Sequence, residues 1–222
     1  MRFRNGKTHR KFFSEGVRVE GDLFLPDGLK AGERRPGIVL CHGFTGIRSF
    51  ILGDYAKVFV EAGFVALTFD YRGFGGSEGT KWRLIPLEQI DDIRNTISFV
   101  ETLPEVDPER IGLWGTSFGG GHAPYAAAID TRIKAAVGQV GFGDGERFLL
   151  DTRIFGERAE LVSQVESDRR RRSREVPKNE GRYLTDRPSP QFADLEFLNQ
   201  AGSLEKSLSN RSTTLIPETG RY

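Results

Sequence analysis

The sequence contains one cysteine, Cys41, in 222 residues, and this excludes an internal disulfide. It also has no apolar run that approaches the ~18 residues of a membrane-spanning helix. The N-terminal residues, MRFRNGKTHRKFF, lack the apolar core of a signal peptide. We therefore expect a soluble, cytoplasmic protein with no membrane partner.

An excess of charge of one sign is also missing. The 32 Lys and Arg residues and 31 Asp and Glu residues give a formal net charge of +1, which provides no general attraction to nucleic acid. Between residues 168 and 187, eight basic residues face four acidic ones. Such a run usually lies on a solvated helix face or in a loop, and the alternative is a patch that binds phosphate or carboxylate. We expect no nucleic-acid partner.

No linker rich in proline, glycine and serine separates two apolar regions, so one domain with a large core is expected. The glycine-rich segment 70–79 lacks the spacing of a phosphate-binding loop, and no Gly-Lys-Ser/Thr follows it. We expect Asp70 and Arg72 to tie this segment together through hydrogen bonds. We expect no cofactor and no metal.

Apolar patterning predicts strands and helices in alternation. Residues 10–25 alternate between apolar and polar side chains, which is typical of a half-solvated hairpin strand. Strict alternation after this hairpin favours the α/β class, with a doubly wound, mainly parallel sheet that binds ligands at the carboxyl ends of its strands. Apolar runs predict buried strands at 37–41, 64–69, 111–114 and 133–140, and helical spacing predicts helices at 50–63, 86–103 and 123–129.

The segment Gly115-Thr116-Ser117-Phe118-Gly119 joins one of these strands to the next helix. Glycines at 115 and 119 allow a sharp reversal because no side chain stands where the two elements touch. The turn would leave Ser117 Oγ exposed at the N-terminus of a helix, where backbone N–H groups and the helix dipole favour negative charge. Ser117 is therefore our candidate nucleophile, and the alternative is a capping serine in an ordinary strand-to-helix turn.

A second turn, His42-Gly43-Phe44, follows the strand at 37–41. A glycine-flanked turn at the end of a strand leaves backbone N–H groups unpaired, and we expect Phe44 N–H to face the substrate. Together with Phe118 N–H it would form an oxyanion hole. His42 is a candidate base, but the favoured interpretation of a histidine in this turn is a structural hydrogen bond.

Three strings resemble the α/β-hydrolase superfamily: HGF at 42–44, DYRGFGGSEG at 70–79 and GTSFGGG at 115–121. They are most similar to the Xaa-Pro dipeptidyl-peptidase-like and dienelactone-hydrolase-like serine hydrolases. The resemblance implies Ser117 as the nucleophile, with the backbone amides of Phe44 and Phe118 as oxyanion donors. It also implies a hydrolase that cleaves an ester, thioester or amide bond, with a core over residues 1–140.

In that superfamily the catalytic serine is followed in the chain by an acid and then by a histidine. This chain has only His9, His42 and His122, and none of them follows such an acid. Asp144 is a candidate acid, and the alternative is a turn residue. Without a general base, hydrolysis is expected to be absent or very weak. The competing hypothesis is a non-catalytic binding or assembly protein that keeps the acyl pocket.

Beyond residue 140 the pattern predicts a helix at 147–165 but no further core strand. The chain would then stop before the last strands of the fold, so we expect a C-terminally incomplete version of a longer hydrolase. The strand at 133–140 would expose a long apolar edge, which a second copy in a homo-oligomer would cover. The resemblance implies a helical cap over 141–222, whose pocket for a small-molecule acyl substrate would be lined by Phe148, Leu149, Phe192 and Phe197.

Overall fold

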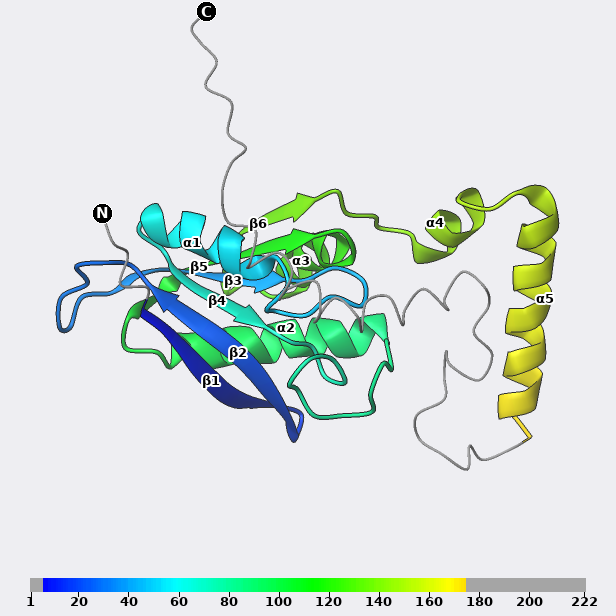
Figure 1. The fold of residues 1–222 in the computed structure, drawn as a ribbon, viewed down its shortest axis with the longest axis horizontal. Helices are drawn as coiled ribbons and strands as arrows, with labels where there is room; N and C mark the ends of the chain where they lie inside the picture. The colour runs from blue at the N-terminus through cyan, green and yellow to red at the C-terminus, as the bar shows by residue number, and fades with distance from the viewer. Residues whose placement is uncertain (1–5, 175–222) are drawn as a thin grey trace, which may run out of the picture. The chain divides into compact units, whose positions relative to one another are not determined.

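The structure, a computed structural model, describes residues 6–174 of the chain (Figure 1). The chain divides into two units, Met1–Gly181 and Arg182–Tyr222, and every described residue lies in the first. The expected division into a core at 1–140 and a cap at 141–222 stays a prediction.

Six strands form one sheet in the order β1-β2-β4-β3-β5-β6. The first two strands form an antiparallel hairpin, and β2 also pairs antiparallel with β4. The other three pairs, β4–β3, β3–β5 and β5–β6, are parallel. The predicted α/β architecture, a mainly parallel sheet with an N-terminal hairpin, is therefore confirmed. The strands are β1 (Gly6–Ser14), β2 (Val17–Leu25), β3 (Arg35–Cys41), β4 (Val65–Phe69), β5 (Val106–Thr116) and β6 (Ile133–Gln139).

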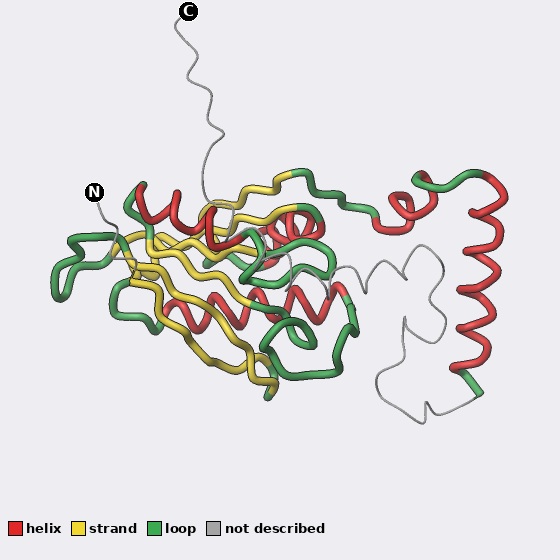
Figure 2. The backbone as a smooth tube through the Cα atoms, viewed as in Figure 1, coloured by secondary structure: helices red, strands yellow, loops and turns green. Residues whose placement is uncertain are grey.

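Helices lie on both faces of this sheet, as Figure 2 shows. Side chains alternate across β3, so Ile38 and Leu40 pack in the cluster that contains the buried residues of α1. Val39 and Cys41 point the other way, into the larger cluster that α2 and α3 complete. Both faces of the central strands are thus apolar, which is why these strands appear in the sequence as continuous apolar runs. The helices are α1 (Leu52–Glu61), α2 (Pro86–Glu101) and α3 (Phe118–Ile129).

The single helix predicted at 147–165 is wrong, because the structure has two shorter helices, α4 (Gly145–Asp151) and α5 (Phe155–Arg172). The first helix ends at Thr152, its C-cap, whose N–H donates to the Phe148 carbonyl at 3.2 Å. Ile154 is extended, and its N–H donates to Glu157 Oε2 at 3.2 Å, which starts the second. Apolar spacing alone did not reveal this break.

Strand β6 is the last strand of the sheet in the described part of the chain, where it pairs only with β5. Its residues after Ile133 are exposed, and Val137 is 53% exposed. A homo-oligomer that covers this edge stays a prediction. None of the helices within residues 6–174 combines the length and the apolar character needed to cross a membrane.

The N-terminus of α3 lies against two strand ends at backbone contact distance. A Cβ added to Gly119 would lie 2.5 Å from the carbonyl oxygen of His42 and closer still to that of Cys41. A Cβ on Gly115 would collide with the carbonyl of Gly119 itself. The expectation that glycines at 115 and 119 allow the strand and the helix to touch is confirmed. Any side chain at 119 would push α3 away from β3.

We predict that Gly119→Ala lowers the free energy of unfolding by about 1–3 kcal/mol, since the new methyl group must displace backbone rather than a flexible side chain. The matched control is Gly156→Ala in α5, where an added Cβ meets nothing within 4 Å. That variant should change stability by no more than about 1 kcal/mol. Urea unfolding followed by circular dichroism measures both, and equal effects would contradict the close packing.

Candidate active site

Ser117 occupies the corner between β5 and α3 with a left-handed backbone, φ 55° and ψ −119°. Such a conformation costs a residue with a side chain on the order of 1–3 kcal/mol and persists only where neighbouring bonds enforce it. Here Ser117 N–H donates to the Gln139 carbonyl at 2.9 Å, and the Ser117 carbonyl accepts from Gly120 N–H at 2.9 Å. The residue is half-buried.

The turn after β3 lies against this serine. A Cβ added to Gly43 would be 3.0 Å from Ser117 Cβ and 3.4 Å from Ser117 Oγ, so only glycine lets the backbone approach. Phe44 follows Gly43, Phe118 follows Ser117, and the two rings meet edge to face with centroids 6.0 Å apart. Within residues 6–174 neither Phe44 N–H nor Phe118 N–H has a hydrogen-bond partner. Both predicted oxyanion donors are therefore unpaired in this part of the chain, and their role stays a prediction.

One end of this turn is held by Asp70, which is buried at the end of β4. Asp70 Oδ1 accepts from the backbone N–H of Arg48 at 2.6 Å, and Oδ2 pairs with the Arg48 guanidinium. Oδ2 also accepts from Gly76 N–H at 3.0 Å. Arg72 binds Asp92 at 2.7 Å. The expectation that Asp70 ties the 70–79 segment together is confirmed by its bond to Gly76, but the partner Arg48 was not foreseen. Arg72 instead joins the segment to Asp92 of α2 and Ser14 of β1.

His42 holds the other end of the turn. Its Nδ1 lies 2.9 Å from the Gly43 carbonyl and therefore carries the proton, while Nε2 accepts from Tyr71 N–H at 3.4 Å. Burial lowers the pKa of this ring, which keeps it neutral. Because both nitrogens bind backbone, His42 has the structural role that the sequence favoured. We call the segment from His42 to Arg48 the clamped turn.

The other two histidines also have partners away from the serine. His122 Nε2 lies 2.9 Å from Gln89 Oε1 of α2, and burial, aided by His42, lowers the pKa of His122 to about 4. His9 lies on β1, 3.2 Å from Asp22. Within the described part of the chain no side chain hydrogen-bonds to Ser117 Oγ. No pattern in the sequence predicts the Gln89 contact, since 33 residues separate the partners.

Asp144 caps α4, and its Oδ1 accepts from Arg147 N–H at 2.9 Å. This is the bond that a turn residue makes, and the catalytic role of Asp144 stays a prediction. Of the predicted pocket residues, Phe148 and Leu149 lie on α4, whereas Phe192 and Phe197 are outside the described residues.

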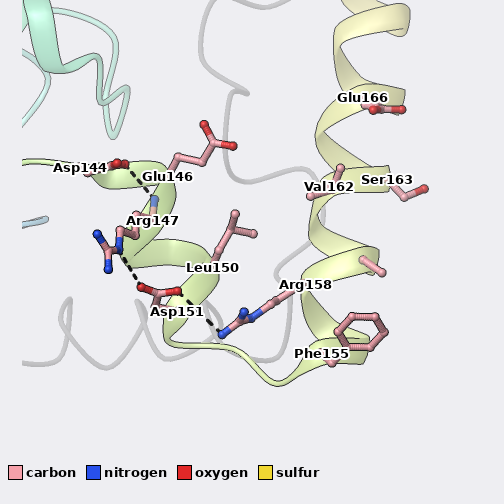
Figure 3. Close-up of a pocket in the computed structure, with 11 residues that line it drawn as sticks. Asp144, Glu146, Arg147, Leu150, Asp151, Phe155, Arg158, Val162, Ser163 and Glu166 are labelled. Atoms are coloured by element: carbon pink, nitrogen blue, oxygen red, sulfur yellow. Dashed lines mark hydrogen bonds and ion pairs between the residues drawn. The ribbon is translucent and has the colours of Figure 1, made fainter.

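A cavity of about 760 Å³ lies between α4 and α5 (Figure 3), and Ser117 does not line it. Asp151 lies on its α4 side, between Arg147 at 3.2 Å and Arg158 at 3.9 Å. Charged side chains predominate, with a few apolar ones from Leu150, Phe155 and Val162. Across residues 6–174, no group of three or more His, Cys, Asp or Glu side chains is placed to hold a metal ion.

We predict that Asp70→Asn destabilises the protein by about 3 kcal/mol, because it leaves the Arg48 guanidinium without its most buried counter-charge. The same change should speed hydrogen exchange of the backbone amides in the clamped turn. The control is Asp54→Asn, because Asp54 is an exposed carboxylate paired with Lys57. Loss of this surface pair should lower the free energy of unfolding by at most about 1 kcal/mol. Hydrogen-exchange mass spectrometry of peptides covering 42–48 tests this, and unchanged exchange in Asp70→Asn would refute the clamp.

The lowered pKa of His122 makes stability depend on pH. Below pH 6.5 the unfolded chain takes up a proton that the folded protein accepts only near pH 4. The free energy of unfolding should therefore fall as the pH drops through this interval, by about 3 kcal/mol from this residue. In His122→Gln the loss between pH 7 and pH 4 should shrink by that amount in urea titrations. An identical slope in both proteins would rule out this linkage.

Comparisons with known proteins agree with this geometry. The sequence pattern of the X-Pro dipeptidyl-peptidase (S15) family matches residues 15–211. The chain is 45% identical over 152 residues to an uncharacterized 31.7 kDa protein from the traX-finO intergenic region of Escherichia coli, covering 68% of this chain and 51% of that protein. It is 34% identical over 124 residues to thiohydrolase aneE of Aspergillus aculeatus, covering 55% and 37%.

Among solved structures, the α/β-hydrolase GrgF from Penicillium sp. superimposes with a TM-score of 0.55 at 31% identity, over 59% of this chain and 44% of that one. The chain spans about half the length of the curated relatives it matches. The chain therefore has the α/β-hydrolase fold and belongs to the X-Pro dipeptidyl-peptidase (S15) family.

Proposed function

We propose that this chain carries the nucleophile and the oxyanion hole of a serine hydrolase that cleaves an acyl bond, an ester, a thioester or an amide, in a small molecule. The observation that carries the proposal is the strained backbone of Ser117 beside Gly43. Strain of this kind at a serine is typical of a functional position. The thiohydrolase among the relatives supports thioesters as one class of substrate.

In the proposed reaction, Ser117 Oγ attacks the carbonyl carbon and the carbonyl oxygen becomes an anion. Phe44 N–H and Phe118 N–H donate hydrogen bonds to that anion, and a single such donor typically contributes ~10²–10³ in rate. The electron pair returns from the oxygen to re-form the carbonyl, and the alcohol, thiol or amine departs. Water then releases the acyl group from the serine.

The hydroxyl proton of Ser117 needs an acceptor during the attack. His42 uses both ring nitrogens for backbone contacts, and His122 binds Gln89. Serine without a base remains a neutral alcohol, so only the oxyanion hole and binding contribute, on the order of 10³–10⁴ over water. We therefore expect this 222-residue chain to hydrolyse esters very weakly by itself.

The lack of a base for Ser117 favours a second candidate. It is a non-catalytic protein that keeps the acyl pocket and uses it to bind acyl compounds or a partner. In that case Ser117 would show no nucleophilic reactivity under any condition. The two candidates differ in one measurable property, the reactivity of the Ser117 hydroxyl when a base is supplied.

We predict that a fluorophosphonate probe labels Ser117 slowly, and that added imidazole accelerates labelling because it supplies the missing base. Ser117→Ala should abolish labelling, while Ser98→Ala, an exposed serine on α2, should leave it unchanged. Intact-protein mass spectrometry measures the rate and peptide mapping locates the adduct. Absence of labelling even with imidazole, in a folded protein, would favour the non-catalytic candidate.

A further inference from the structure

Four phenylalanine rings form a continuous row that starts at Phe44 in the clamped turn. Phe44 meets Phe118 at 6.0 Å between ring centroids, and Phe118 meets Phe142 at 5.4 Å. Phe142 then stacks on Phe148 of α4 at 4.3 Å with an interplanar angle of 5°. We call these four residues the phenylalanine row. It connects three segments that are far apart in the sequence.

The row exists because the backbone after β6 approaches α3 closely. A Cβ added to Gly121 would collide with the Phe142 carbonyl, and one added to Gly120 would lie 2.5 Å from the Gln139 carbonyl. These two glycines let the segment 139–142 reach the first turn of α3, which is where the Phe118 ring stands. Asp144 then caps α4 and brings Phe148 back onto Phe142.

The two ends of the row have ring surface available for a ligand. Phe44 is 43% exposed and Phe148 is 45% exposed, while Phe118 and Phe142 are half-buried. Phe118 also contacts the His122 ring at 4.3 Å. Burial lowers the pKa of His122 to about 4, so the ring that contacts Phe118 is uncharged at neutral pH.

We propose that the phenylalanine row binds the acyl group of the substrate and that this acyl group carries an aromatic ring, an inference that rests on the proposed function. Gly43 lies against Ser117, Phe44 follows Gly43 and Phe118 follows Ser117, so an acyl group on Ser117 stands close to the first two residues of the row. A flat ring makes stacked or edge-to-face contacts with such rings at centroid distances of about 4.5–7 Å. An acetyl group would leave the row unfilled.

The test uses reversible ligands, so that it does not depend on catalysis. Sodium 3-phenylpropanoate, hexanoate and acetate are titrated into the full chain, and dissociation constants come from NMR shift changes. We expect 3-phenylpropanoate to bind at least about tenfold more tightly than acetate and more tightly than hexanoate. Phe148→Ala should weaken its binding about tenfold, Phe148→Trp should retain it, and Phe13→Ala, an exposed ring on β1, should have no effect.

Thermal unfolding of each variant checks that it is folded. Equal affinity for 3-phenylpropanoate and acetate would overturn the proposal, as would unchanged affinity in Phe148→Ala. Hexanoate binding as tightly as 3-phenylpropanoate would overturn the aromatic class. If the ligand pattern holds while Ser117 resists the fluorophosphonate with imidazole, the proposed hydrolase function fails and the ligand class stands. If Ser117 is labelled but the ligand pattern fails, only the phenylalanine row is refuted.

Discussion

The close contact between the first turn of α3 and the ends of β3 and β6 is the constraint on which the site depends. Ser117 N–H binds the Gln139 carbonyl of β6, while Gly119 lies against the carbonyls of Cys41 and His42 after β3. One helix end therefore fixes the distance between the nucleophile, the clamped turn and the segment that carries Phe142. A side chain at Gly119 or Gly120 would separate them all together, because proteins pack too densely to absorb such a shift locally.

The second constraint is electrostatic. Asp70 and Asp22 are buried carboxylates, and Arg48 lies between them, with its Nε 3.4 Å from Asp22. A buried ion pair contributes little net stability, but removal of one partner is costly, so such a cluster favours one arrangement over others. Here that arrangement places the clamped turn, since Arg48 reaches Asp70 through its backbone as well as its side chain. The position of Phe44 thus depends on charges on β2 and β4, elements with no atom at the nucleophile.

Periodicity and local motifs were sufficient for the α/β class, the N-terminal hairpin and the Ser117 corner, because these follow from residues close in sequence. They did not predict the order of the strands in the sheet. The contacts of Arg48 with Asp70 and of His122 with Gln89 were not predicted, since both join side chains more than 20 residues apart. The break between α4 and α5 was also not predicted, because apolar spacing carries no signal for it. Sequence therefore located the strand-to-helix corner at Ser117, and tertiary contacts decided what holds it in place.

The histidines explain why nearness to the serine is not enough for catalysis. His122 is on the helix that follows Ser117, but a base with a pKa of about 4 takes a proton from a serine hydroxyl with a poor driving force at neutral pH. His42 is equally unsuited to act as a base, since the lone pair of its Nε2 accepts a hydrogen bond from Tyr71 N–H. Both rings gain their roles from burial, which favours the neutral form and a fixed geometry. A catalytic histidine needs the reverse, a carboxylate partner and room to become charged, so neither of these two rings is suited to accept the Ser117 proton in the proposed reaction.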